Sequence, residues 1–172
     1  MVIYSIGHST RSLEELIAAL NAHSVQLLAD VRSVPRSRRL PHFNRESLSE
    51  SLPAAGIEYR HLATLGGWRK ARPDSPNLAW RSEGFRGYAD YMLTSEFERA
   101  LDELIELARR KTSAFMCAEV TYKRCHRMLI ADALTVRGLE VRHILDARRL
   151  EPHQLTPFAR VDGKRLFYPA LI

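Results

Sequence analysis

Short apolar segments alternate along this chain with segments of helical apolar spacing, and this alternation constrains the fold more than any other feature. Strand-like apolar runs occupy residues 2–6, 25–31, 57–62, 113–119 and 139–145. Between them apolar residues recur at helical intervals. Strands separated by helices pair in parallel through right-handed crossovers. The sequence therefore predicts a single α/β domain over residues 1–172, with a mainly parallel β-sheet flanked by helices.

Capping patterns predict where several helices begin and end. Ser12-Leu13-Glu14-Glu15 has capping-box spacing, and Ser95-Glu96-Phe97-Glu98 repeats it. Asn44 predicts a further helix start, and Gly56 suits the left-handed end of that helix. Pro53 predicts a kink or an early stop in the same helix.

The remaining segments predict two helices, a hairpin and a long loop. The helices are expected over residues 85–92 and 124–137. A C-terminal β-hairpin is expected to pair residues 158–160 with 164–168 around Asp162-Gly163. Residues 66–84 form a Gly- and Pro-containing loop, and a loop of this length in a domain is usually functional or mobile.

The charge balance predicts anionic partners. The net charge is +6 with a pI near 9.7, and the basic residues concentrate in residues 32–45 and 69–72. No apolar run approaches the roughly 20 residues that span a bilayer, so we expect a soluble cytoplasmic protein without a membrane partner. In that compartment the two cysteines are expected to be free thiols, metal ligands or redox groups rather than a disulfide. The sequence does not predict an oligomeric state.

Reactive side chains follow the apolar runs where the predicted strands end. In parallel sheets, ligands bind beyond the carboxyl ends of the strands. A second group of reactive side chains lies at the start of the helix expected over residues 124–137. We therefore predict that one cavity is surrounded by His8, Asp30, Arg32, Cys117, Glu119, Cys125, His126 and Arg127.

Cys125 is predicted to be the more reactive of the two cysteines. A helix N-terminus and the flanking Arg124 and Arg127 would stabilise its thiolate, whereas Cys117 lies in an apolar strand. The alternative is that both cysteines are small buried residues without a chemical role. Glu119 could act in acid–base chemistry or could only pair with an arginine.

The sequence does not identify a cofactor or assign a metal site, although Cys117, Glu119, Cys125 and His126 include ligand types that zinc accepts. The spacing of the cysteines and His126, C-x7-C-H, matches no common zinc module. Neither a Walker motif nor a dinucleotide-binding fingerprint occurs, which disfavours an ATPase or a Rossmann dehydrogenase. The arginines at positions 36, 38, 39 and 45 could bind phosphates beside Trp68, or could form a solvated basic loop.

Several polar segments lie at the predicted strand ends and in the loops that follow them. They are Ser5-Ile6-Gly7-His8-Ser9-Thr10, Asp30-Val31-Arg32-Ser33-Val34-Pro35-Arg36-Ser37, Pro41-His42-Phe43-Asn44, Leu65-Gly66-Gly67, Gly84-Phe85-Arg86-Gly87-Tyr88, Cys117-Ala118-Glu119 and Cys125-His126-Arg127. In this order the segments resemble the bacterial family known as domain of unknown function 488. The resemblance covers nearly the whole chain and implies a shared ligand site, to which His42 and Tyr88 would belong. It implies no particular reaction.

A weaker likeness of layout is to rhodanese-type domains. These also have an Asp-Val-Arg strand end and a later strand, cysteine loop and helix. In this chain residues 120–123 contain no glycine, and Arg124 is displaced by one residue, so the cysteine loop does not match.

The leading hypothesis is an enzyme that binds an anionic, phosphate-bearing ligand at the carboxyl edge of the sheet. Its anion-binding residues would be Arg32, Arg36 and Arg127, with His42, Trp68, Tyr88 and His126 also at the ligand. Its catalytic residues would be His8, Asp30, Glu119 and Cys125.

Two other hypotheses use the same residues differently. In the first, Arg36, Arg38, Arg39 and Trp68 bind nucleic acid without turnover. In the second, Cys117 or Cys125 carries out sulfur transfer or redox chemistry.

Overall fold

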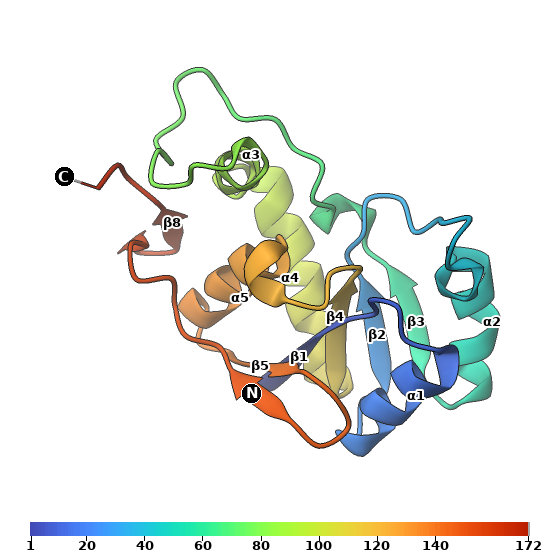
Figure 1. Cartoon of the computed structure of the whole chain (residues 1–172). Coiled ribbons are helices and arrows are strands. Elements are labelled where there is room, and N and C mark those ends of the chain that lie inside the picture. Colours follow the sequence, from blue (N-terminus) through green and yellow to red (C-terminus); the bar gives the residue numbers. More distant parts are fainter. Residues whose placement is uncertain (172) are drawn as a thin grey trace.

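A mainly parallel sheet of six strands forms the centre of the molecule, in the order β3-β2-β4-β1-β5-β6 (Figure 1). The computed structural model describes residues 1–171. The parallel strands are β1 (Val2–Gly7), β2 (Leu27–Asp30), β3 (Glu58–His61), β4 (Ser113–Cys117) and β5 (Glu140–Ile144). The predicted α/β class is therefore confirmed. The antiparallel edge strand β6 (Leu150–Pro152) was not predicted, because three residues show no periodicity.

Helices cover both faces of this sheet, as a parallel sheet requires. On one face α1 (Leu13–Ala22) and α2 (Arg45–Ala54) pack over residues such as Leu28 and Met116. On the other face α4 (Ser95–Arg110) and α5 (Arg127–Val136) pack over the alternate residues, such as Phe115. Figure 1 shows these two helical layers on opposite sides of the strands.

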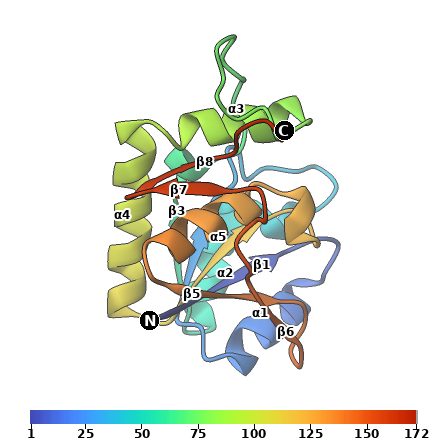
Figure 2. The same ribbon diagram turned by 90° about the vertical axis from the view of Figure 1, so that its left-hand side faces the viewer.

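Helix α3 (Glu83–Tyr91) and the C-terminal hairpin lie near the N-terminal end of α4. Helix α3 crosses that end, and the hairpin of β7 (Arg160–Asp162) and β8 (Arg165–Phe167) lies beside it (Figure 2). The predicted C-terminal hairpin is confirmed. Short 3-10 turns occupy η1 (Pro41–Phe43), η2 (Ala63–Leu65) and η3 (Tyr122–Arg124).

The predicted helix starts at Ser12 and Asn44 are confirmed, and the one at Ser95 is corrected. Ser12 and Glu15 form the complete capping box of α1. Helix α4 is capped by Thr94, not Ser95, because the Thr94 hydroxyl accepts the amide of Phe97 at 3.2 Å. The side chain of Asn44 makes no cap bond; it instead accepts the amide of Ser37 at 2.6 Å and so closes the basic loop.

Pro53 lies inside the last turn of α2, and the helix ends one residue later, at Ala54. Helix α5 begins at Arg127 rather than at residue 124, because η3 comes first and Cys125 is extended, with φ −136° and ψ 150°.

A buried carboxylate, that of Asp90 in α3, binds three donors of the long loop before that helix. It accepts hydrogen bonds from the amide of Arg72 at 2.8 Å, the hydroxyl of Ser75 at 2.6 Å and the side-chain amide of Asn77 at 2.7 Å. Buried polar groups need such partners, and here a single side chain supplies three loop donors with an acceptor. The loop is therefore anchored to the helix that follows it.

Within residues 1–171, no helix is both long enough and apolar enough to pass through a bilayer.

Candidate functional site

A cavity of about 500 Å³ lies beyond the carboxyl ends of β2 and β4. Four stretches of chain build its wall: the residues after β2, the loop before α3 with the start of that helix, the residues after β4, and η3 with the two residues that follow it. The lining residues are Arg32, Ser33, Val34, Gly67, Trp68, Ser82, Gly84, Phe85, Cys117, Ala118, Glu119, Lys123, Arg124, Cys125 and His126. A cavity of this volume suits a small-molecule ligand.

Two thiols and an imidazole form a cluster in the cavity wall. Nδ1 of His126 lies 3.6 Å from Sγ of Cys125 and 3.9 Å from Sγ of Cys117. Nε2 of the same ring is 2.9 Å from the carbonyl oxygen of Val31. Because a carbonyl can only accept, Nε2 carries a proton, and in the neutral ring the Nδ1 lone pair faces the sulfurs.

The two thiols differ in their acidity. The pKa of Cys125 lies well below its usual value, because the Cys117 thiol donates a hydrogen bond to its sulfur and the charge of Arg127 stabilises the thiolate. The pKa of Cys117 is raised, because its thiol donates to Cys125 and because it is buried. Cys125 is therefore the thiolate of the pair. Arg124, which was predicted to contribute, is exposed and plays no part in this shift.

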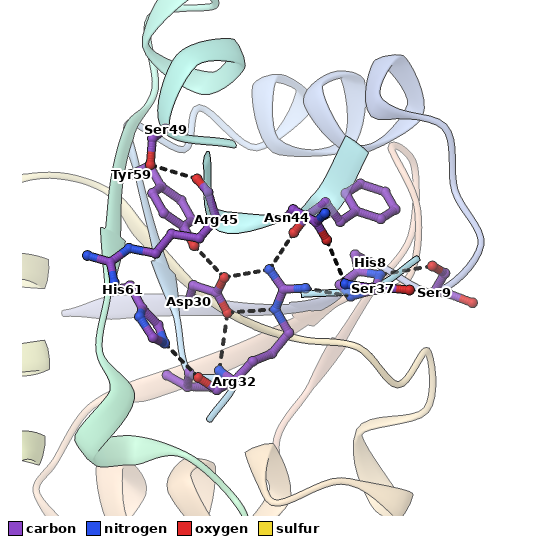
Figure 3. Close-up of polar contacts among 12 residues, drawn as sticks. His8, Ser9, Asp30, Arg32, Ser37, Asn44, Arg45, Ser49, Tyr59 and His61 are labelled. Atoms are coloured by element: carbon purple, nitrogen blue, oxygen red, sulfur yellow. Dashed lines mark hydrogen bonds and ion pairs between the residues drawn. The ribbon is translucent and has the colours of Figure 1, made fainter. Parts of the chain in front are cut away.

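Arg32 and Asp30 form a buried ion pair, shown in Figure 3. Nε and Nη2 of Arg32 donate to the two Asp30 oxygens at 2.9 and 2.6 Å, and Nη2 also donates to the carbonyl of Phe43 at 2.7 Å. The hydroxyl of Tyr59 donates to Asp30 at 2.6 Å. Arg32 reaches the cavity, but its charge is already matched by Asp30, so it is not the free anion-binding group that was predicted.

His8 lies behind this ion pair and does not line the cavity. Its Nε2 is 3.2 Å from Nη1 of Arg32, and its ring packs on Phe43 with centroids 4.4 Å apart. Burial, followed by the charge of Arg32, lowers the pKa of His8 to about 4. The ring is therefore neutral at pH 7. Its predicted role in proton transfer at the ligand does not fit this position.

Arg127 is also a structural residue and not an anion-binding one. It is only 1% exposed; Nη1 donates to the hydroxyl of Ser5 at 3.1 Å, and Nη2 donates to the carbonyl oxygen of Glu119. Gly7 allows the loop after β4 to approach this closely, since a Cβ there would lie 1.8 Å from the same carbonyl oxygen. Arg127 and Gly7 together fix the backbone that presents Glu119.

The Ser5 hydroxyl, which accepts from Arg127, is also part of a chain of buried hydrogen bonds. Ser5 bonds Nδ1 of His143 at 2.5 Å, Nε2 of His143 bonds Nδ1 of His153 at 2.9 Å, and Nε2 of His153 bonds Asp132 at 2.8 Å. The hydroxyl of Tyr168, which follows β8, donates to the other Asp132 oxygen at 2.7 Å. With Nε2 donating and Nδ1 accepting in both histidines, every bond in the chain has a donor and an acceptor.

The carboxylate of Glu119 is exposed in the cavity wall. Among the described residues it makes no ion pair, so the predicted pairing with Arg32 or Arg127 does not form. It is the free carboxylate of the cavity and stays a candidate for proton transfer.

Besides Arg127, three other predicted ligand residues lie outside the cavity wall. Arg36 is exposed on the basic loop, and His42 packs on Phe43 with centroids 4.1 Å apart. Tyr88 is fully buried, and its ring supports His126 from behind at 5.1 Å between centroids. Trp68 does line the cavity and is 79% exposed.

The sequence analysis missed several cavity residues. Lys123 and Arg124 are the exposed cations of the wall, and Ser33, Ser82 and Phe85 contribute two hydroxyls and a ring. Lys123 and Ser82 belonged to no predicted motif. Ser33 and Phe85 stood only in the segments that resemble the family, and Arg124 was considered only as a neighbour of Cys125.

The fold and the cavity together define an α/β domain with a thiol- and imidazole-lined pocket at the carboxyl edge of a parallel sheet. The chain belongs to the family described as domain of unknown function DUF488, whose model matches residues 12–134. No match was found among curated proteins or among solved structures. The likeness of layout to rhodanese-type domains receives no support from these comparisons.

Proposed function

We propose that this protein is an enzyme that acts on an anionic ligand carrying a flat ring, with the cluster of Cys117, Cys125 and His126 as its reactive centre. One observation carries the proposal: the three donor atoms lie within 4.8 Å of one another in the wall of a ligand-sized cavity. Convergent reactive groups in a concave site are the usual mark of an active site.

The charges of the wall support an anionic ligand. Lys123 and Arg124 are exposed there, and the ion pair of Lys123 with Glu151 is long, at 3.8 Å, and open to solvent. Such a pair contributes little and leaves the ammonium available for a phosphate or carboxylate. These two cations replace Arg36 and Arg127 as the proposed anion-binding groups.

The apolar groups of the wall support a flat ring in the ligand. Trp68 and Val34 are 79% and 53% exposed, although large apolar side chains are usually buried. With Phe85 they border the same cavity as the two cations. A base or another planar ring stacked on Trp68 would cover this surface, and its phosphate would reach Lys123 or Arg124. A nucleotide has both parts.

Two features keep the alternative functions open to test. The exposed arginines of residues 36–45 favour a nucleic-acid ligand, which would extend across the basic loop. The contact of the two thiols favours thiol redox or sulfur-transfer chemistry. A substrate with a planar ring explains more directly than either alternative why the exposed Trp68 lies in the same cavity wall as Cys117, Cys125 and His126.

The test is titration calorimetry with nucleoside mono-, di- and triphosphates and with inorganic phosphate. We expect binding of a nucleotide that weakens at least tenfold in Trp68→Ala and in Arg124→Ala, which remove the stacking surface and a cation. Arg38→Ala is the matched control, because Arg38 is exposed but lies outside the cavity wall, and it should bind as the wild type does.

The results that would overturn the proposal are equally specific. If no nucleotide binds, or if Arg38→Ala weakens binding as much as Arg124→Ala does, the ligand does not sit in this cavity as described.

A further inference from the structure

We infer that Cys117, Cys125 and His126 hold a zinc-type metal ion whose fourth coordination position opens into the cavity. The inference deepens the proposed function, since the same three residues form its reactive centre. Sequence spacing gave no metal site here, because the ligands come from a strand end and from the residues between a 3-10 turn and a helix, not from one compact loop.

The distances between the donor atoms fit a tetrahedral site. Zinc binds sulfur at about 2.3 Å and imidazole nitrogen at about 2.0 to 2.1 Å, which places the two donors about 3.6 Å apart at a tetrahedral angle. The observed separations from Nδ1 of His126 are 3.6 Å to Cys125 and 3.9 Å to Cys117, and all three atoms lie within 4.8 Å. Binding would require only small side-chain adjustments.

The tautomer of His126 is the one that metal binding requires. Its Nε2 proton is held by the carbonyl of Val31 at 2.9 Å, so the other nitrogen presents a lone pair. Metal-binding histidines commonly donate their second ring N–H to a backbone carbonyl in this way, which fixes the ring and raises its basicity. The bond to Val31 is an observation independent of the sulfur positions.

The backbone holds the two sulfurs in place before any ion binds. The carbonyl of Cys117 accepts the amide of His8 at 3.0 Å, and the amide of Cys125 donates to Tyr122 at 3.1 Å. The amide of Arg127 points at Sγ of Cys125 at 3.5 Å, as an amide does toward a coordinating thiolate. The site is therefore largely preformed.

Two thiolates and one imidazole select the kind of metal. Soft sulfur ligands with nitrogen favour Zn²⁺ and disfavour Mg²⁺ or Ca²⁺, which take oxygen ligands. Structural zinc sites have four protein ligands, whereas catalytic sites have three and an open position. This cluster offers three, and all of them line the cavity. The open position would take a water molecule or an atom of the anionic ligand.

The experiment measures metal binding without any assay of activity. Untagged full-length protein, purified without chelators, is analysed for metal by mass spectrometry. The metal-free, reduced protein is then titrated with Co²⁺. We expect about one zinc ion per chain and, with Co²⁺, the intense near-ultraviolet charge-transfer band of cobalt–thiolate bonds. Cys117→Ser, Cys125→Ser and His126→Gln should each lower the affinity at least tenfold.

A matched control separates ligation from general damage. His23→Gln removes a half-buried histidine that makes one backbone contact, to Asp146, and lies outside the cavity wall, so it should leave metal binding unchanged. Because His126→Gln could loosen the fold through the loss of the Val31 bond, circular dichroism accompanies every variant, and the two serine variants carry the test if that one unfolds.

Several outcomes would overturn the inference. In the first, the reduced protein takes up no zinc and gives no charge-transfer band with Co²⁺. In the second, the ligand variants bind metal as tightly as the wild type. In the third, a Cys117–Cys125 disulfide forms readily and the reduced protein binds no metal. The last outcome would favour the redox alternative. Nucleotide binding without metal would leave the proposed function standing. Metal binding without any nucleotide binding would leave only the inference standing.

Discussion

Replacing Asp90 by Asn should detach the loop before α3 without unfolding the sheet. The buried carboxylate accepts from the loop donors of Arg72, Ser75 and Asn77. An amide of the same size loses the charge, and its NH₂ group must face at least one of those donors. Hydrogen bonds to charged groups contribute about 1.5 to 3 kcal/mol, and the unpaired donor adds a desolvation cost. We expect a loss of about 3 kcal/mol in the free energy of loop opening.

A change of that size raises the population of the open loop by about 100-fold. The assay is cleavage by dilute trypsin at the exposed Lys70 and Arg81, with hydrogen exchange of residues 70–81 as a second readout. When opening is fast relative to cleavage, the cleavage rate follows the open population. The free energy of cooperative unfolding in urea should fall by less than the free energy of loop opening.

Asp74→Asn provides the control in the same loop. Asp74 pairs with the Arg72 side chain at 2.8 Å, but its side chain is 71% exposed. An exposed pair contributes at most about 1 kcal/mol, so cleavage should rise less than about fivefold. If the two variants are cleaved at rates within threefold of each other, the buried carboxylate is not what holds the loop.

Three further predictions follow from the described contacts. Because the pKa of His8 is lowered from 6.5 to about 4, the free energy of unfolding should fall as the pH falls from 6.5 toward 4, by up to about 1.4 kcal/mol per pH unit. In urea melts at pH 7, 6 and 5, His8→Gln should lose less stability than the wild type, and an equal loss in both proteins would contradict the assignment. In reduced, metal-free protein at neutral pH, iodoacetamide should label Cys125 faster than Cys117, because only the former has a lowered pKa; peptide mass analysis showing equal or reversed labelling would remove the thiolate argument. Oligonucleotide binding should be weak, with a slope of log affinity on log salt smaller than about 2, whereas a slope of several units that is lost on combined Arg38→Ala and Arg39→Ala substitution would establish the nucleic-acid alternative.

The sequence predicted the sheet well because buried parallel strands have a simple pattern. Strands covered on both faces are nearly continuous apolar runs, so β2 and β4 were recognisable without any knowledge of their neighbours. Helix ends were less certain: adjacent hydroxyl residues at positions 94 and 95 both suit a cap, and only the backbone geometry shows that Thr94 is the one used.

The site was predicted in location but not in the roles of its residues. Placing Arg32 and Cys117 at one sheet edge required only the strand directions. Whether an arginine is free depends on partners distant in sequence, such as the Glu119 carbonyl for Arg127, and no local pattern encodes these. The metal inference is of the same kind, since the approach of His126 to both sulfurs depends on the extended backbone at Cys125.

The chain of hydrogen bonds from Arg127 to Tyr168 shows that this fold needs residues well beyond the end of the family match. The family model ends at residue 134, but Asp132 takes its partners from His153, Thr156 and Tyr168. A chain cut after residue 134 would leave a buried carboxylate facing no donors and would remove the histidine that Ser5 bonds. We expect it to be insoluble or unfolded. Residues 135–171 therefore belong to the same cooperative unit as the cavity, although they contribute no residue to its wall.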